Sequence, residues 1–237
     1  MKLKRRLIAL ISLLISAYTL FLYSKSRNSQ LFGTILSSVK TNDKIVALTF
    51  DDGPNSLYTD SILAILDSAD IKATFYLVGK EIESHPEELR KIISHGHEIG
   101  NHSYSHTRMI LKSYGFIEDE IEHTNSLIRK SGYSAEITFR PPYGKKLFLL
   151  PYILMRKKIR TIMWNIEPDS IDSLASDAGR MTKYVEQTIE PGSILLMHVW
   201  PESRTHSRAA LLPIIQVLKE KQYKFVTVSQ LLSANQK

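Results

Sequence analysis

From Lys44 onward, short apolar segments alternate with longer amphipathic ones, and this alternation limits the chain to a few folds. The short segments are rich in β-branched and aromatic residues, so strands are predicted at 45–50, 73–78, 97–100, 136–140, 161–166, 193–198 and 224–228. The longer segments predict helices at 57–69, 85–95, 115–131, 145–158, 174–189 and 207–221. Because each helix returns the chain to the same edge of the sheet, the strands are expected to run parallel.

The size of this region decides between architectures. The 194 residues from 44 to 237 are slightly too few for a complete eight-unit (β/α) barrel. We therefore predict an α/β fold, namely a distorted or incomplete (β/α) barrel of about seven parallel strands. An open, doubly wound sheet is the alternative.

The N-terminus predicts a membrane segment. Residues 7–23 are uncharged and apolar, follow the basic sequence MKLKRR, and as a helix barely match a hydrocarbon layer of ~30 Å. A secretory signal peptide would have a shorter apolar core and a small-residue cleavage site, and no Ala-x-Ala pattern follows this run. We expect an uncleaved, single-pass anchor in the cytoplasmic membrane with the rest of the chain exported. If the segment is cleaved, the protein would be secreted instead.

Three parts of the chain are therefore expected: a membrane anchor at 1–23, a linker at 24–43 and a catalytic domain at 44–237. The linker is Ser-rich and includes a short packed segment around residues 31–36.

The distribution of charge argues against a nucleic acid partner. Six of the 31 basic residues and none of the 24 acidic ones lie in the first 28 positions, so the rest of the chain carries 25 basic and 24 acidic side chains. A nearly neutral body does not offer a phosphate-binding surface. The chain has no cysteine, which excludes disulfides and thiolate metal sites.

Polar side chains follow the predicted strands at one end. They are Asp51, Asp52, His102, His106, Arg140, Glu167, Asp169 and His198. Since the carboxyl ends of parallel strands share one face, and such folds assemble their active sites on that face, we expect these side chains to lie together.

The sequence HSYSH at 102–106 is a candidate metal site. If the segment is helical, His102 and His106 project from one face, and two imidazoles plus a carboxylate form a common ligand set for divalent cations. Of Asp51 and Asp52, one would bind the cation, and the other would accept a proton from a water molecule whose pKa the cation lowers. The cation would also relieve the repulsion between the adjacent carboxylates. By itself, an HxxxH pair is more often structural.

Two further features fit acid–base chemistry. His198 ends an apolar strand, where it could protonate a leaving group or could simply be a core histidine bonded to the backbone. The loop from Arg140 to Gly144, RPPYG, is stiffened by two prolines and could aim a backbone N–H at a developing oxyanion. The alternative is a rigid turn whose arginine pairs with an acid.

These motifs resemble those of a known family. The sequences TFDDGP at 49–54, HSYSH at 102–106, RPPYG at 140–144 and LMH at 196–198 occur in the order seen in the polysaccharide deacetylases of carbohydrate esterase family 4. The resemblance covers roughly residues 44–232 and four of the five family motifs. It implies a distorted (β/α) barrel and metal-dependent N-deacetylation of a glycan.

The resemblance also implies roles for individual residues. Asp52, His102 and His106 would bind the metal, which is expected to be zinc, with cobalt or another divalent ion as the alternative. The remaining roles are Asp51 as the base, Arg140 as the residue that orients the base, His198 as the acid, the backbone N–H of Tyr143 as the oxyanion donor, and Leu196 as a residue that lines the acetyl pocket. We also expect Trp164 to bind the substrate.

The fourth family motif departs from the pattern. Ser170 and Ile171 stand where an Asp-Trp pair is expected. Glu167 or Asp169 could supply the missing charge beside His198, and we favour Asp169.

The main hypothesis is a hydrolase that removes N-acetyl groups from an N-acetylhexosamine-containing glycan outside the membrane, such as peptidoglycan, a chitin-like polymer or an exopolysaccharide. One alternative is an O-acetyl esterase or a deacylase of a lipid-linked sugar. Another is a catalytically silent, glycan-binding member of the same fold, which the altered fourth motif suggests.

Overall fold

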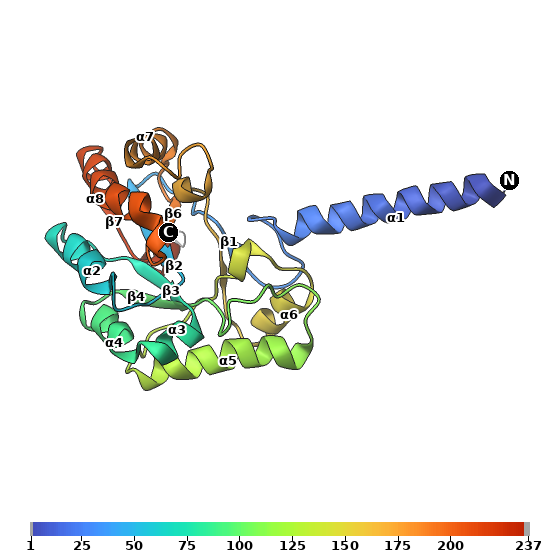
Figure 1. Cartoon of the computed structure of the whole chain (residues 1–237), viewed down its shortest axis with the longest axis horizontal. Helices are drawn as coiled ribbons and strands as arrows, with labels where there is room; N and C mark the ends of the chain where they lie inside the picture. Colours follow the sequence, from blue (N-terminus) through green and yellow to red (C-terminus); the bar gives the residue numbers. More distant parts are fainter. Residues whose placement is uncertain (1, 235–237) are drawn as a thin grey trace.

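The structure is a computed structural model that describes residues 2–234. A sheet lies at the centre of the body, helices cover its outside, and one long helix, α1 (Lys2–Ser24), projects away from the body (Figure 1). The strands are β1 (Ile35–Leu36), β2 (Ile45–Asp51), β3 (Thr74–Leu77), β4 (Glu98–Asn101), β5 (Thr161–Ile162), β6 (Ile194–Met197) and β7 (Lys224–Phe225). Every pair of these strands is parallel, which confirms the prediction.

The strands close into a distorted barrel. Hydrogen-bonded neighbours run in the order β4-β3-β2-β6, β7 pairs with the first residues of β2, and β1 pairs with β5. Isolated parallel bridges from Asn101 to Phe139, from Phe139 to Thr161 and from Ile166 to Leu195 join β4 to β5 and the segment after β5 to β6. This ring of pairings supports the barrel over the open sheet.

The prediction of a strand at 136–140 is wrong. Only Phe139 makes bridges there, with its N–H donating to Arg160 O at 3.0 Å. Pro141 and Pro142 follow, and proline has no N–H with which to extend a ladder. The strand predicted at 161–166 is likewise shortened to β5, while β1 was not predicted, so the described strands number seven with a different membership.

Each predicted helix is present with shifted ends. They are α2 (Thr59–Ser68), α4 (Pro86–Ser94), α5 (Tyr114–Lys130), α6 (Leu149–Arg156), α7 (Ala178–Thr188) and α8 (Thr205–Glu220). Local signals set the ends: Pro86 opens α4, and Ser113 caps α5 by accepting a hydrogen bond from Phe116 N. Two short helices, α3 (Gly79–Ser84) and α9 (Val228–Ala234), were not predicted.

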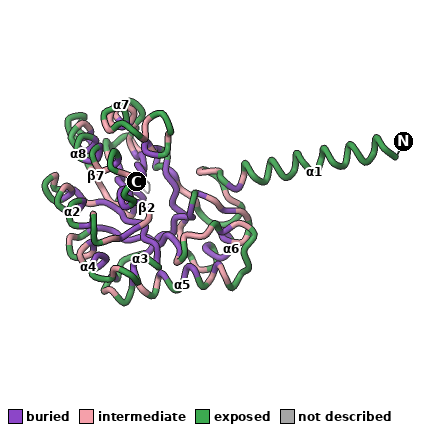
Figure 2. The backbone as a smooth tube through the Cα atoms, viewed as in Figure 1, coloured by how far each residue is buried: buried purple, intermediate pink, exposed green. Residues whose placement is uncertain are grey.

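The core lies on both faces of the central strands. From Val46 to Asp51, every residue of β2 is buried, and buried backbone follows the sheet in Figure 2. Parallel strands covered on both sides read as continuous apolar runs, which explains why "IVALTF" shows no alternation. A charged side chain at the end of such a strand is therefore placed on a rigid support.

The N-terminal helix differs from all the others in its exposure. The helix α1 is long and apolar enough to cross a membrane, and its leucines and isoleucines face outward rather than into the core. A signal sequence can have the same length and apolar composition, so membrane anchoring stays a proposal. At its end, Ser24 is buried against the body, where its carbonyl accepts a hydrogen bond of 2.8 Å from Lys146 N.

The segment predicted as a linker packs against the barrel. In addition to β1, Val39 is buried and its N–H donates to Gly192 O at 2.9 Å. Gly192 has φ +81°, and a Cβ placed there would lie 1.8 Å from Val39 O. The backbone at residue 192 therefore lies too close to the backbone at Val39 for any residue with a Cβ atom to stand at 192.

We expect Gly192→Ala to lower the free energy of unfolding of the full chain by roughly 1–3 kcal/mol, since it combines a clash with a left-handed backbone. The measurement is urea unfolding in detergent followed by circular dichroism. Gly115→Ala is the control, because no atom lies within 4 Å of its added Cβ, and its stability should be unchanged or raised by up to about 1 kcal/mol. Equal behaviour of the two variants would contradict the packing of residue 39 on the barrel.

Candidate functional site

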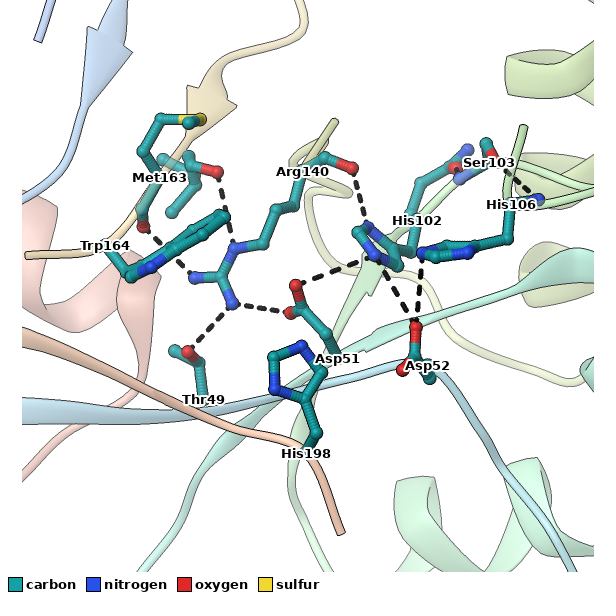
Figure 3. A network of polar contacts seen from close by, with 12 residues as sticks. Thr49, Asp51, Asp52, His102, Ser103, His106, Arg140, Met163, Trp164 and His198 are labelled. Carbon is teal, nitrogen blue, oxygen red and sulfur yellow. Dashed lines mark hydrogen bonds and ion pairs between the residues drawn. The ribbon is translucent and has the colours of Figure 1, made fainter. Parts of the chain in front are cut away.

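The ends of three parallel strands bring acidic and imidazole side chains together (Figure 3). Asp51 is the last residue of β2, His102 directly follows β4, and His198 directly follows β6. A cavity of about 370 Å³ lies over them. It is lined by Arg27, Asp51, Asp52, His102, His106, Tyr143, Trp164, Glu167, Ser170, His198 and Arg204.

Asp52, His102 and His106 form a group that could hold a cation. One ligand atom from each lies within 4.8 Å of the others. Asp52 Oδ1 is 3.3 Å from His106 Nε2 and 3.8 Å from His102 Nε2. These side chains come from two loops some 50 residues apart in sequence, which the adjacent strand ends bring together.

The helical geometry suggested for residues 102–106 is wrong. The segment is an irregular turn in which Ser103 and His106 have φ of 69° and 56°. Ser103 Oγ accepts a hydrogen bond of 3.0 Å from His106 N, and this folds the turn so that the two imidazole centroids are 4.9 Å apart. Asp52 also has a left-handed backbone, with φ 72°. Such conformations cost energy and cluster at functional sites.

The surroundings of His102 suit a metal ligand. Its Nδ1 lies 2.8 Å from Arg140 O, an acceptor, so Nδ1 carries the proton and the lone pair of Nε2 faces Asp52. Burial, together with the nearby His106, lowers the pKa of His102 to about 3, which keeps the ring neutral. A neutral imidazole with its second nitrogen fixed by a carbonyl is what a divalent cation requires. The residues present therefore fit such a cation.

A second group, Glu167, Asp169 and His198, has similar spacing but fits a cation less well. Glu167 Oε2 already accepts from Trp164 Nε1 at 2.6 Å and from Arg27 Nη2 at 2.8 Å. Asp169 Oδ2 accepts from the N–H of His198 at 2.6 Å. Since these carboxylate oxygens are occupied by donors, the first group is the better candidate.

Arg140 holds Asp51 from its buried side. Its fully buried guanidinium donates to Asp51 Oδ1 at 2.6 Å and to Thr49 Oγ1 at 2.9 Å, and Nη2 donates to Met163 O at 3.2 Å (Figure 3). Burial raises the pKa of Asp51, while the charge of Arg140 opposes that rise. A carboxylate with a raised pKa is a better proton acceptor at neutral pH.

His198 lies beside Asp51 and is held by Asp169. The His198 N–H donates to Asp169 Oδ2, and Nδ1 is 3.3 Å from Asp169 Oδ1. Asp169 is fully buried and also accepts from Ser207 Oγ at 3.2 Å. Between the two acids that were considered for this position, the structure places Asp169 against the imidazole, whereas Glu167 faces Arg27.

The remaining predicted residues surround the cavity unequally. Tyr143 has φ 58°, and its ring lies 4.7 Å from His106, centroid to centroid. Its backbone N–H has no acceptor among the described residues, so it is available to a ligand. Trp164 lines the cavity, whereas Leu196 is buried in a cluster that includes Trp164 and is not among the lining residues.

Arg27 was not identified from the sequence as a residue of the site. It lies 140 residues from its partner Glu167, in a segment read only as a Ser-rich linker. A single arginine in a polar segment carries no periodicity or motif that could have indicated this contact.

Comparisons with known proteins show which family the chain belongs to. The family model described as polysaccharide deacetylase matches residues 38–166. A peptidoglycan-N-acetylglucosamine deacetylase of Bacillus cereus is 31% identical over 200 residues, which cover 84% of this chain and 93% of that protein. The peptidoglycan-N-acetylmuramic acid deacetylase PdaC of Bacillus subtilis is 33% identical over 198 residues, 82% of this chain and 40% of that protein.

Solved structures share the fold. The Bc1960 peptidoglycan N-acetylglucosamine deacetylase superimposes with a TM-score of 0.77 at 32% identity and covers 82% of this chain and 91% of its own. BA3943 of Bacillus anthracis, described as a pseudoenzyme of carbohydrate esterase family 4, superimposes with a TM-score of 0.75 at 30% identity, over 86% and 70% of the two chains. Because a deacetylase and a protein described as a pseudoenzyme both share this fold, the fold by itself does not establish turnover.

We expect His198 to titrate near pH 9 in the metal-free protein. Burial lowers its pKa, but the hydrogen bond and charge of Asp169 and the charges of Asp51 and Asp52 outweigh burial and raise the pKa to about 9. Protonated His198 therefore stabilises the fold below its unfolded pKa of about 6.5, and this contribution is lost as the pH rises through about 9.

NMR titration of the imidazole C–H resonance, assigned with His198→Gln, measures this pKa. Asp169→Asn should return it toward about 6.5, whereas Asp172→Asn, which removes an exposed acid of the same loop, should leave it in place. A wild-type value near 6.5 would contradict the described contact between His198 and Asp169.

Proposed function

The chain belongs to the polysaccharide deacetylase family, and on that basis we propose that it hydrolyses N-acetyl groups from a glycan containing N-acetylhexosamine, with the help of a divalent cation. One observation carries the proposal. One cavity is lined by Asp51, which Arg140 holds, by the group of Asp52, His102 and His106, and by His198, which Asp169 holds.

Asp52, His102 and His106 are proposed to hold the cation. When bound, it would activate a water molecule and polarise the acetamide carbonyl. Zinc is the proposed ion, because two imidazoles and one carboxylate suit zinc and leave positions open for water and substrate. Cobalt or another divalent ion is the alternative.

Asp51 is proposed as the general base. Arg140 leaves Asp51 Oδ2 directed toward the cation group, 3.6 Å from His102 Nε2, while Oδ1 is tied to the guanidinium. Asp51 would take the proton of the attacking water as its oxygen bonds to the acetyl carbon. Arg140 is a positioning residue, since it acts through Asp51.

His198 is proposed as the general acid. In its protonated form it would give a proton to the amide nitrogen as the C–N bond breaks, so that an amine and acetate are released. Asp169 orients the ring and stabilises its charged form. The free N–H of Tyr143 would stabilise the charge that develops on the carbonyl oxygen.

The proposed substrate is a polymer of the cell envelope. Named relatives are peptidoglycan deacetylases, and here a second cavity of about 410 Å³ shares Asp52 and His106 with the first and extends toward Lys80 and Trp200. A chain of sugars could occupy both cavities. With α1 as an anchor, the catalytic domain would act outside the cytoplasmic membrane.

We expect a chelator to abolish acetate release by the full chain in detergent, and added zinc to restore it. The substrates are N-acetylglucosamine oligomers and peptidoglycan fragments, and released acetate is the readout. Tight glycan binding without acetate release under any divalent ion would instead support a silent, binding member of the family.

Asp51→Asn should lower kcat by roughly 10²- to 10⁴-fold, because it removes the proton acceptor. The variant should retain one zinc ion per chain, measured by elemental analysis. Asp119→Asn, which neutralises an exposed acid on α5, is the control and should keep full activity. Near-normal turnover in Asp51→Asn would remove Asp51 from the role of base.

A further inference from the structure

Arg27 places a guanidinium in the cavity from outside the barrel. It lies three residues beyond the end of α1, and its Nη2 is 2.8 Å from Glu167 Oε2. The centre of its guanidinium lies 4.6 Å from the centroid of the Trp164 ring. Arg27 thus contacts two residues that line the cavity and lines it as well.

The segment that carries Arg27 is fixed to the body by Lys146. Lys146 N donates to Ser24 O at 2.8 Å, and its ammonium group donates to Ser26 O. The Lys146 side chain is 1% exposed, and burial lowers its pKa to about 8. Burying an ammonium group is costly unless it is hydrogen-bonded, and here Ser26 O accepts its hydrogen bond. These two contacts tie the turn directly before Arg27 to the body.

In the Arg27–Glu167 pair, the positively charged Arg27 is the more exposed partner and faces the cavity. The side chain of Arg27 is 41% exposed, whereas that of Glu167 is 13% exposed. Glu167 Oε2 is shared with Trp164 Nε1, which holds the acid on the inner side. Of the five N–H donors of an arginine, only one has an acceptor among the described residues, so the others are available to a ligand.

We propose that Arg27 is a specificity-determining residue that binds an oxyanion substituent, a carboxylate or a phosphate, on the glycan beside the acetamido group being hydrolysed. The proposal rests on the proposed deacetylase function. A guanidinium with several free donors, placed by its contacts with Glu167 and Trp164, is suited to either oxyanion. Arg204 and protonated His198, which also line the cavity, add positive charge there.

The oxyanion could come from two sources. A carboxylate could belong to the sugar itself, as in an ether-linked lactate or a uronic acid. A phosphate could join the sugar to a lipid, and α1 would hold Arg27 within a few residues of a membrane surface.

The test compares three substrates with the zinc-loaded full chain in detergent. They are a neutral N-acetylglucosamine tetramer, an oligomer alternating N-acetylglucosamine with N-acetylmuramic acid, and N-acetylglucosaminyl phosphate joined to a short prenyl chain. We expect kcat/KM to be higher for at least one charged substrate than for the neutral one. Arg27→Ala should lower that charged-to-neutral ratio about tenfold or more, mainly through KM.

Two further variants separate recognition from structure. Arg27→Lys, which keeps the charge, should retain more of the ratio than Arg27→Ala. Lys25→Ala, which removes an exposed cation two residues away that does not line the cavity, should leave the ratio unchanged. Loss confined to the muramic acid oligomer identifies a carboxylate, and loss confined to the prenyl substrate identifies a phosphate. An equal loss on all three substrates, or no loss on any, overturns the proposal.

A binding measurement keeps this test separate from the deacetylase proposal. In the Asp51→Asn background, calorimetric titration with the same three compounds reports affinity without turnover. Adding Arg27→Ala should weaken binding of the preferred charged compound about tenfold and should affect the tetramer less. Absence of acetate release by the wild-type chain contradicts the deacetylase function, whereas unchanged affinity in this double variant contradicts the role of Arg27.

Discussion

The buried guanidinium of Arg140 connects the parts of this site. Its side chain donates to Asp51 and Thr49 on β2 and to Met163 O after β5, while its own carbonyl accepts from His102 Nδ1. A charge buried this deeply is tolerated only when its donors are satisfied, so the ends of the strands must meet around it. Arg140 therefore positions Asp51, which is proposed as the base, and also sets the tautomer of His102, which is proposed as a metal ligand.

The sequence was sufficient to predict most of the described strands, the parallel barrel and the face on which the polar residues lie, although it missed β1 and predicted a strand at 136–140 where only Phe139 makes bridges. Strand ends with polar residues directly after them lead to that face whatever the details of the loops. The turn at 102–106 could not be predicted, because left-handed residues at Ser103 and His106 replace the helix that the four-residue spacing suggested. Nor could the contact of Arg27 with Glu167, which depends on how the chain leaves α1.

Although Ser170 and Ile171 stand where an Asp-Trp pair was expected, the chain still has a carboxylate beside His198. Ser170 lines the cavity, and the carboxylate beside His198 comes from Asp169, one position earlier, in a short 3-10 turn at Pro168–Ser170. The neighbouring acid, Glu167, is paired with Arg27 instead. The shape of the cavity at this edge therefore depends on the segment after α1 as well as on the barrel.

The central claim is that Asp52, His102 and His106 hold one cation. Diffraction from crystals of the zinc-loaded protein, with anomalous data at the zinc edge, tests it most directly. The account predicts one zinc peak about 2.0–2.2 Å from the Nε2 atoms of both imidazoles and from an oxygen of Asp52. A peak between Glu167, Asp169 and His198 instead, or carboxylate and imidazoles too far apart to share one ion, would contradict it.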